Sequence, residues 1–292
     1  MPLSLKINPR VAAQSTRTTF ARMTPTTTPP TIVFLHGFAE SREVWTDFTR
    51  AFPDGYRLLA PNLPGHGTNL APVPDFSMEA QARSVIEYLN QKGCSEPVLL
   101  VCHSMGGYVA LALAERWPQR VAGVAFINSS ALADTDEKRQ NREKNITFVQ
   151  KHGVGKFMES FVRPLFAPVN RDRLTEARGL LEEIGKATPE TTIVGALRGM
   201  AARPDRTAVL AKAAFPVLLV AGKHDVAVHL RRPCGRRRCP RWGRPCFWRA
   251  AGTSPIWSSL SPRAGRCWRW RRRCLGGSGP RADYFSLLIE RQ

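Results

Sequence analysis

The amino-acid sequence predicts an α/β protein whose mostly parallel sheet carries helices on both faces and a helical cap insert over one end. Two observations favour this class. Between residues 31 and 130, short apolar runs alternate with helical patterns, which is typical of a parallel sheet built from strand–helix–strand units. The next segment, 131–210, is helical throughout, and the strand pattern resumes only within 211–229. We therefore expect a core in two parts, with the cap inserted between them.

Each element of the core is indicated by its own pattern. Apolar runs bounded by turn residues predict buried strands, and they occupy 31–37, 56–67 (which continues into a Gly/Pro loop), 97–104, 121–129 and 215–225. Amphipathic patterns predict the helices between these strands, at 42–52, 77–93 and 106–118. Ser77 and Gly93 are suitable capping residues for the second of these helices. Inside the cap, four helical patterns follow one another at 136–152, 154–166, 171–187 and 189–202.

The amino-terminal 30 residues differ from this pattern. They are rich in Thr and Pro, and the first acidic residue of the chain is Glu40. Such a composition resembles an organelle transit peptide, but no amphipathic face is evident. We expect residues 1–30 to be a disordered leader, or Met23 to be the true start. Because the sequence contains no apolar run long enough for a transmembrane helix, we expect a cytoplasmic protein without a membrane partner.

The motif CHSMGG, residues 102–107, marks the candidate active site. It follows an apolar strand pattern and precedes an amphipathic helix. A G-x-S-x-G turn in this context places its serine on a tight strand-to-helix bend, with the hydroxyl above the end of the sheet. Gly106 satisfies the small-residue requirement two positions after Ser104, whereas Cys102 replaces the usual glycine two positions before it. We therefore expect Ser104 to be a nucleophile with strained backbone angles.

With this motif the chain resembles the α/β-hydrolase superfamily over about residues 31–228. The segment LHGF at 35–38 is similar to the family's oxyanion loop. The resemblance implies that the N–H groups of Phe38 and Met105 bind the oxyanion. It also implies that Asp225, in the segment VLLVAGKHD, is the acid of the catalytic triad.

A second loop carries the resemblance and one departure from it. The segment NLPGHG at 62–67 is similar to the family's D-x-P-G-x-G loop, with Asn62 in place of the usual Asp. His66 in this loop is expected to organise the backbone, because it lies far from the position of a catalytic base.

The triad histidine is missing from the sequence. The family has this histidine in a G-H-x-x-H-like loop near the carboxyl terminus, but no histidine follows His229 here; the six histidines are His36, His66, His103, His152, His224 and His229. His224 and His229 flank Asp225, so neither can reach Ser104 while that acid orients it. As written, the chain has a nucleophile and an acid but no catalytic His.

Residues 230–282 have an aberrant composition. They contain 15 Arg with no Lys, Asp or Glu, and so account for 15 of the 20 net positive charges of the chain. Three interpretations are open. Arg and Trp are typical of a nucleic-acid-binding tail, and cysteines can bind zinc, although no C-x₂-C pair occurs among Cys234, Cys239, Cys246, Cys267 and Cys274. The third interpretation is that this segment is read in the wrong frame.

The third interpretation is favoured by the sequence that a shifted reading frame gives. With plausible GC-rich codons, residues 252–261 (GTSPIWSSLS) read one base earlier become GHIAHLEQPE. The same shift converts 263–275 into an Ala- and Leu-rich helix pattern, and residues 283–292 look like the remnant of a terminal helix. We favour a frameshifted segment, in which case the histidine exists in the gene but not in this chain.

The resemblance implies a serine hydrolase that acts on a small ester or thioester through an acyl-enzyme, without a cofactor or metal. Its partner would be a small-molecule ester-type substrate, and no specific nucleic acid is expected. The missing histidine predicts impaired activity. A lyase or C–C hydrolase on the same fold, and a non-catalytic binding protein, remain alternatives.

Overall fold

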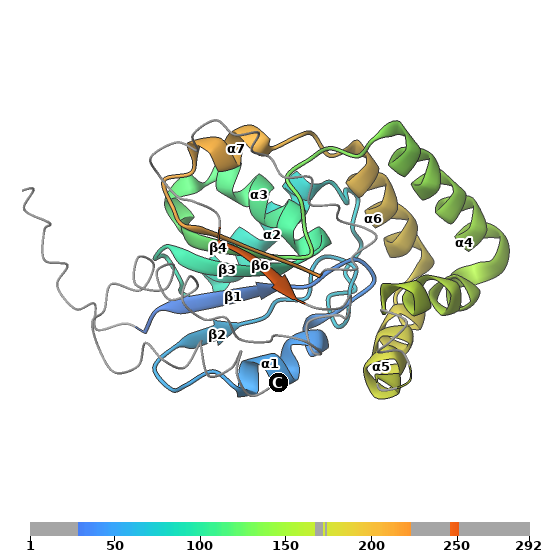
Figure 1. Cartoon of the computed structure of the whole chain (residues 1–292), viewed down its shortest axis with the longest axis horizontal. Helices are drawn as coiled ribbons and strands as arrows, with labels where there is room; N and C mark the ends of the chain where they lie inside the picture. Colours follow the sequence, from blue (N-terminus) through green and yellow to red (C-terminus); the bar gives the residue numbers. More distant parts are fainter. Residues whose placement is uncertain (1–28, 167–171, 173, 223–245, 251–292) are drawn as a thin grey trace, which may run out of the picture.

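The structure, a computed structural model, describes residues 29–166, 172, 174–222 and 246–250 (Figure 1). Its centre is a six-stranded sheet in the order β2-β1-β3-β4-β5-β6, in which every neighbouring pair is parallel. The strands are β1 (Thr31–Leu35), β2 (Arg57–Leu59), β3 (Val98–His103), β4 (Val121–Ile127), β5 (Val217–Gly222) and β6 (Cys246–Ala250). The predicted α/β class with a parallel sheet is therefore confirmed.

Helices cover both faces of this sheet. In Figure 1, α1 (Thr46–Arg50) lies on one side, and α3 (Met105–Arg116) and α7 (Thr207–Lys212) lie on the other. The helix α2 (Met78–Gln91) packs against α3. Since both faces are covered, the side chains of β1 and β3 are buried along their whole length.

The predicted caps of α2 are confirmed. The Ser77 hydroxyl accepts a hydrogen bond from the Ala80 N–H at 3.2 Å. At the other end, the backbone of Gly93 has a φ of 63°, just after the C-cap Lys92. Glycine adopts this left-handed conformation without the steric cost that other residues meet.

The segment 131–210, here called the helical insert, lies beside one end of the sheet (Figure 1). Its helices are α4 (Asp136–Val162), α5 (Thr175–Lys186) and α6 (Glu190–Ala202). The sequence predicts separate helices at 136–152 and 154–166. The break between them is confirmed: α4 is interrupted at Gly153, whose backbone is non-helical (φ 81°, ψ 161°), and its second part is followed by a 3-10 turn at Arg163–Leu165.

One short part of the carboxyl-terminal segment joins the sheet. The Arg-rich composition of residues 230–282, interrupted by Gly and Pro, predicts that this segment fails to complete the sheet and helix that family members have after the acid. The structure instead places β6 parallel to β5, with Leu218 beside Cys246 and Gly222 beside Ala250 in the register. The β5 edge offers unpaired backbone N–H and C=O groups, which a short extended segment can pair with whatever its side chains are. The other residues of this segment lie outside the described ranges.

Within the described ranges, no helix combines the length and apolar character needed to cross a membrane. A cytoplasmic location stays a prediction.

Candidate active site

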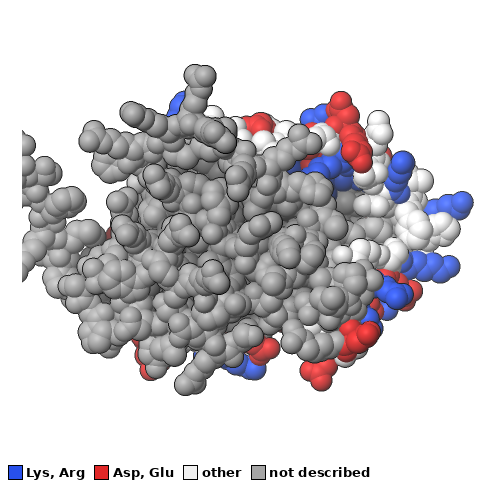
Figure 2. Space-filling view, in the orientation of Figure 1, with Lys and Arg blue, Asp and Glu red and all other residues white. Residues whose placement is uncertain are grey.

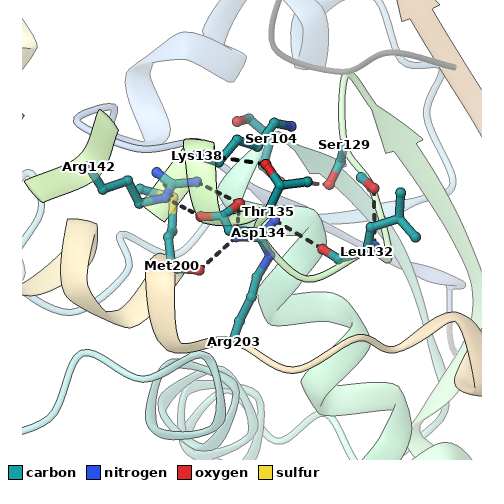
Figure 3. Close-up of polar contacts among 10 residues, drawn as sticks. Ser104, Ser129, Leu132, Asp134, Thr135, Lys138, Arg142, Met200 and Arg203 are labelled. Atoms are coloured by element: carbon teal, nitrogen blue, oxygen red, sulfur yellow. Dashed lines mark hydrogen bonds and ion pairs between the residues drawn. The ribbon is translucent and has the colours of Figure 1, made fainter. Parts of the chain in front are cut away.

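Ser104 occupies the bend between β3 and α3, as the sequence predicts. Its backbone has φ 45° and ψ −112°, which is a strained conformation for a residue with a side chain. Hydrogen bonds hold the strained peptide on both sides: the Ser104 N–H donates to Ile127 O at 3.0 Å, and the Ser129 hydroxyl donates to Ser104 O at 2.8 Å (Figure 3). The side chain of Ser104 is partly exposed. The bend therefore presents a hydroxyl at the carboxyl end of the sheet.

The two glycines after the bend are required by close contacts, with backbone at Gly106 and with side chains at Gly107. A Cβ atom on Gly106 would lie 2.4 Å from Leu35 O and 2.7 Å from His36 O. A Cβ atom on Gly107 would lie 2.2 Å from the Ser129 hydroxyl oxygen. The start of α3 can thus approach the end of β1 only because Gly106 lacks a side chain, and Gly107 leaves room for the side chain of Ser129.

Cys102 departs from the family motif, and its surroundings show why it is tolerated. The residue is fully buried in β3, and this burial raises the pKa of its thiol well above the usual value. The thiol therefore stays neutral and packs as a small apolar side chain.

The proposed oxyanion donors lie on neighbouring strand ends. Phe38 follows β1, and Met105 is the first residue of α3, directly after β3. Because Leu35 of β1 pairs in register with Cys102 of β3, the two segments leave the sheet side by side. The N–H of Met105 is also at a helix N-terminus, where backbone N–H groups and the helix dipole favour negative charge.

Two buried histidines organise the loops around this site. His36 lies against Gly37 O through Nδ1 at 2.9 Å, and its Nε2 accepts a hydrogen bond from the Leu63 N–H at 2.9 Å. This pattern corresponds to the neutral tautomer with the proton on Nδ1, and burial lowers the pKa of His36. His66 contacts Pro64 O at 2.9 Å, and burial lowers its pKa to about 3. The contact of His66 with Pro64 agrees with the loop-organising role expected for His66.

Asn62, the other departure from the family motif, uses both ends of its amide. Its Oδ1 accepts a hydrogen bond from the Arg42 N–H at 2.7 Å, and its Nδ2 donates to the Thr68 hydroxyl at 3.2 Å. Its main-chain oxygen accepts from Asn69 Nδ2 at 3.0 Å. An ionised carboxylate at this position could not donate to Thr68.

A buried pair, Glu40 with His103, lies next to these elements and was not found from the sequence. His103 Nδ1 lies 2.9 Å from one carboxylate oxygen of Glu40 and 3.0 Å from the other. The available signal was positional: an acid follows the oxyanion loop, and a histidine directly precedes the nucleophile. The resemblance already implied that Phe38 and Met105 meet at one oxyanion site, but no residue pattern paired Glu40 with His103.

A second buried ion cluster, also missed, joins the helical insert to the core (Figure 3). The Asp134 carboxylate binds Arg142 of α4 at 2.5 Å and Arg203, just after α6, at 2.8 Å. The Arg203 guanidinium also stacks on the ring of Tyr108 in α3, at 3.9 Å from its centroid. Burial by itself raises the pKa of Asp134, but the Arg142 and Arg203 interactions reverse this effect and the pKa lies below its ordinary value. The beginning of the helical insert, at Asp134, is thus bound to its end, at Arg203, and Arg203 in turn contacts the core helix α3.

A cavity of about 290 Å³ is present elsewhere, between the Asn62 loop and α2. Its lining is largely polar and includes Arg42, Ser84 and Tyr88, but not Ser104, Phe38 or Met105. This cavity is therefore separate from the candidate nucleophile.

Asp225 and most of the Arg-rich segment, with Cys234, Cys239, Cys267 and Cys274, lie outside the described residues. Only the backbone of Cys246 is described, in β6. Among the residues that are described, no group of three His, Cys, Asp or Glu side chains could hold a metal ion. Figure 2 shows the described residues of the helical insert at one edge of the molecule, where basic and acidic side chains are mixed.

Comparison with known proteins agrees with this geometry. The sequence pattern described as alpha/beta hydrolase fold matches residues 30–231, and the chain belongs to this family. A monoacylglycerol lipase from Bos taurus is 30% identical over 120 residues, which cover 40% of this chain and 36% of that protein. A Bacillus subtilis protein provisionally assigned as a 2-succinyl-6-hydroxy-2,4-cyclohexadiene-1-carboxylate synthase is 27% identical over 207 residues, covering 66% of this chain and 73% of its own length. The chain thus spans little more than a third of the lipase.

Solved structures support the same family. A thermophilic esterase from Thermogutta terrifontis superposes with a TM-score of 0.65 at 28% identity, over 68% of this chain and 74% of the esterase. An enol-lactonase from Burkholderia xenovorans, at 21% identity and a TM-score of 0.62, shows the shared fold. Among its relatives are therefore esterases and lipases, and the chain is a hydrolase-family protein.

Proposed function

We propose that this chain is a serine carboxylesterase by descent, acting on a small ester or thioester through an acyl-enzyme. The observation that carries the proposal is the strained bend at Ser104, at the carboxyl end of β3 and the N-terminus of α3. This arrangement exposes a hydroxyl beside helix N–H groups, which suits attack on an acyl carbon and stabilisation of the resulting oxyanion.

The proposed reaction has two steps. The Ser104 oxygen forms a bond to the acyl carbon, the bond to the leaving oxygen or sulfur breaks, and the leaving group takes the proton of the serine hydroxyl. Water then attacks the acyl-enzyme and releases the acid. The N–H groups of Phe38 and Met105 are proposed to stabilise the oxyanion in both steps, and Asp225 to orient a histidine that transfers the protons.

This chain is proposed to be impaired because it lacks that histidine. No histidine follows His229 in the sequence. His36 and His66 are held by loop contacts and are neutral because of burial. A serine hydroxyl without a base is a weak nucleophile at neutral pH.

An apolar substrate is favoured by the aromatic side chains above the oxyanion loop. The ring of Phe38 lies 5.4 Å from that of Phe161 and 6.4 Å from that of Phe157, both in α4. The kink at Gly153 redirects α4 before these residues. We therefore propose that the helical insert acts as a cap and supplies an apolar wall to the acyl site.

The test compares three proteins with p-nitrophenyl butyrate as substrate. The chain as written should be nearly inactive, whereas a chain in which the shifted frame is restored between residues 229 and 282 should hydrolyse the ester. Ser104→Ala in the restored chain should abolish that activity. A restored chain that folds but hydrolyses none of a panel of esters and thioesters would contradict the proposal.

A second candidate is a lyase or C–C hydrolase on the same site. The long match to the provisionally assigned Bacillus subtilis synthase favours keeping it. Such an enzyme would use Ser104 with a histidine for proton abstraction rather than acyl transfer, so covalent labelling of Ser104 by an ester would not accompany turnover. A non-catalytic binding protein would show neither labelling nor turnover in the restored chain.

A further inference from the structure

Glu40 is a buried carboxylate on the oxyanion loop, only 5% exposed. Its Oε2 accepts a hydrogen bond from the Gly37 N–H at 2.7 Å. The same carboxylate contacts Nδ1 of His103, which is 9% exposed. Glu40 is therefore bound both to the loop that contains Phe38 and to the residue directly before Ser104.

The carboxylate is held in its charged form. Burial by itself raises the pKa of Glu40, but the charge and the hydrogen bond of His103 and the hydrogen bond from the Gly37 N–H together place that pKa below its ordinary value. An ionised acceptor makes hydrogen bonds about twice as strong as a neutral one, so the contacts of Glu40 are suited to fixing a backbone position.

The loop backbone rests directly on this pair. A Cβ atom on Gly37 would lie 2.9 Å from Glu40 Oε2 and 2.9 Å from His103 Nδ1. From the other side, Gly37 O contacts His36, whose ring also binds the Leu63 N–H. The peptide before Phe38 is thus confined between two sets of buried polar contacts.

The pair is also placed symmetrically with respect to the proposed oxyanion donors. Phe38 lies two residues before Glu40, and Met105 lies two residues after His103. The two segments leave neighbouring strands, β1 and β3. The Glu40–His103 contact is therefore a short connection between the backbone segments that carry the two N–H groups.

We infer that Glu40 and His103 are positioning residues that set the spacing of the Phe38 and Met105 N–H groups, and that they favour the tetrahedral oxyanion over the planar substrate. The inference rests on the proposed function of Ser104. Neither Glu40 nor His103 is proposed to contact the substrate. Misplacing a reacting or stabilising group by about 1 Å can cost roughly a hundredfold in rate, so a modest loop shift is sufficient for a measurable effect.

The experiment uses the full chain as it exists and a probe that needs no catalytic base, 2-phenylethylboronic acid. The Ser104 oxygen forms a bond to boron, the hydroxyl proton goes to solvent, and boron becomes tetrahedral and anionic with an oxygen in the oxyanion position. Tetrahedral boron is detected by ¹¹B NMR. The planar ground-state comparator is 3-phenylpropanamide, whose binding is followed by ligand-observed NMR.

Glu40→Gln should weaken boronate binding by about tenfold or more, in line with the loss of part of one oxyanion interaction, and leave amide binding unchanged. The matched control is Glu43→Gln, which removes a carboxylate from the same region without touching the pair and should change neither affinity. A second matched set is made at His103. His103→Asn keeps a donor nitrogen attached to Cγ and should retain most of the boronate affinity, whereas His103→Leu should behave like Glu40→Gln.

Two results would overturn the inference alone: boronate binding in Glu40→Gln as tight as in the unsubstituted chain, or an equal loss of boronate and amide binding. If Glu40→Gln does not fold, as judged by circular dichroism, the His103→Asn and His103→Leu comparison decides, and equal boronate affinities in these two variants would overturn it. Two other results would instead contradict the proposed function of Ser104. The first is the absence of a tetrahedral boron signal in the unsubstituted chain, and the second is a signal that persists in Ser104→Ala.

Discussion

Replacing Ser104 with glycine should raise the free energy of unfolding, whereas replacing it with alanine should not. The Ser104 backbone, with φ 45° and ψ −112°, is in a region that favours glycine. Such strain costs about 1–3 kcal/mol for a residue with a Cβ atom. Glycine relieves it, at a cost of roughly 0.5–1 kcal/mol in extra conformational entropy of the unfolded chain.

The alanine variant isolates the backbone contribution. Ser104 is the N-cap residue of α3, but its side chain makes no capping hydrogen bond, so removal of the hydroxyl should by itself change stability little. The expected difference is therefore about 0.5–2 kcal/mol in favour of Ser104→Gly over Ser104→Ala, opposite to the usual order of these residues. Urea unfolding followed by tryptophan fluorescence measures it, with equal m-values required for the comparison. An alanine variant as stable as the glycine variant would refute the strain argument.

Three further predictions concern the core and the helical insert. Gly106→Ala should reduce the yield of folded protein and lower the midpoint of thermal unfolding, because its Cβ would lie 2.4 Å from Leu35 O; an unchanged midpoint would show that α3 can move away from β1. Asp134→Asn should cost about 3 kcal/mol, since it leaves the buried Arg203 guanidinium without its carboxylate. The pKa of Asp134 is lowered in the folded state, so its contribution is present above the unfolded-state pKa and is lost as pH falls through the folded-state pKa. Acid titrations of both proteins should therefore converge at low pH, and a constant difference would contradict the assignment. In α4, no atom would crowd a Cβ at Gly153 or Gly155. Gly155→Ala should stabilise the protein by up to about 1 kcal/mol because alanine favours helix, whereas Gly153→Ala should destabilise it because the φ of Gly153 is 81°. Equal effects of the two substitutions on thermal unfolding would refute this contrast.

Local patterns in the sequence were sufficient for much of the fold. The apolar run at 98–103, followed at once by Ser104 and two glycines, is enough to predict a buried strand, a tight bend and a helix, because each is set by side-chain size and polarity over a few residues. Ser77 and Gly93 were likewise identifiable as caps from their chemistry. The break in α4 was also accessible, since the helical patterns at 136–152 and 154–166 are separated by Gly153, a residue that can end a helix.

The charged contacts of the site depended on tertiary structure. Glu40 and His103 are 63 positions apart in the chain, and Asp134 and Arg203 meet only through the folding of the helical insert. No local rule pairs such residues, because the free energy of a buried ion pair depends on which strands become neighbours and on how completely water is excluded. The β6 strand illustrates the same limit: no strand was predicted at 246–250, and these residues pair with the unpaired backbone edge that β5 presents. The sequence by itself thus determined most of the elements and the candidate nucleophile, whereas the tertiary structure decided which buried charges hold the loops around it.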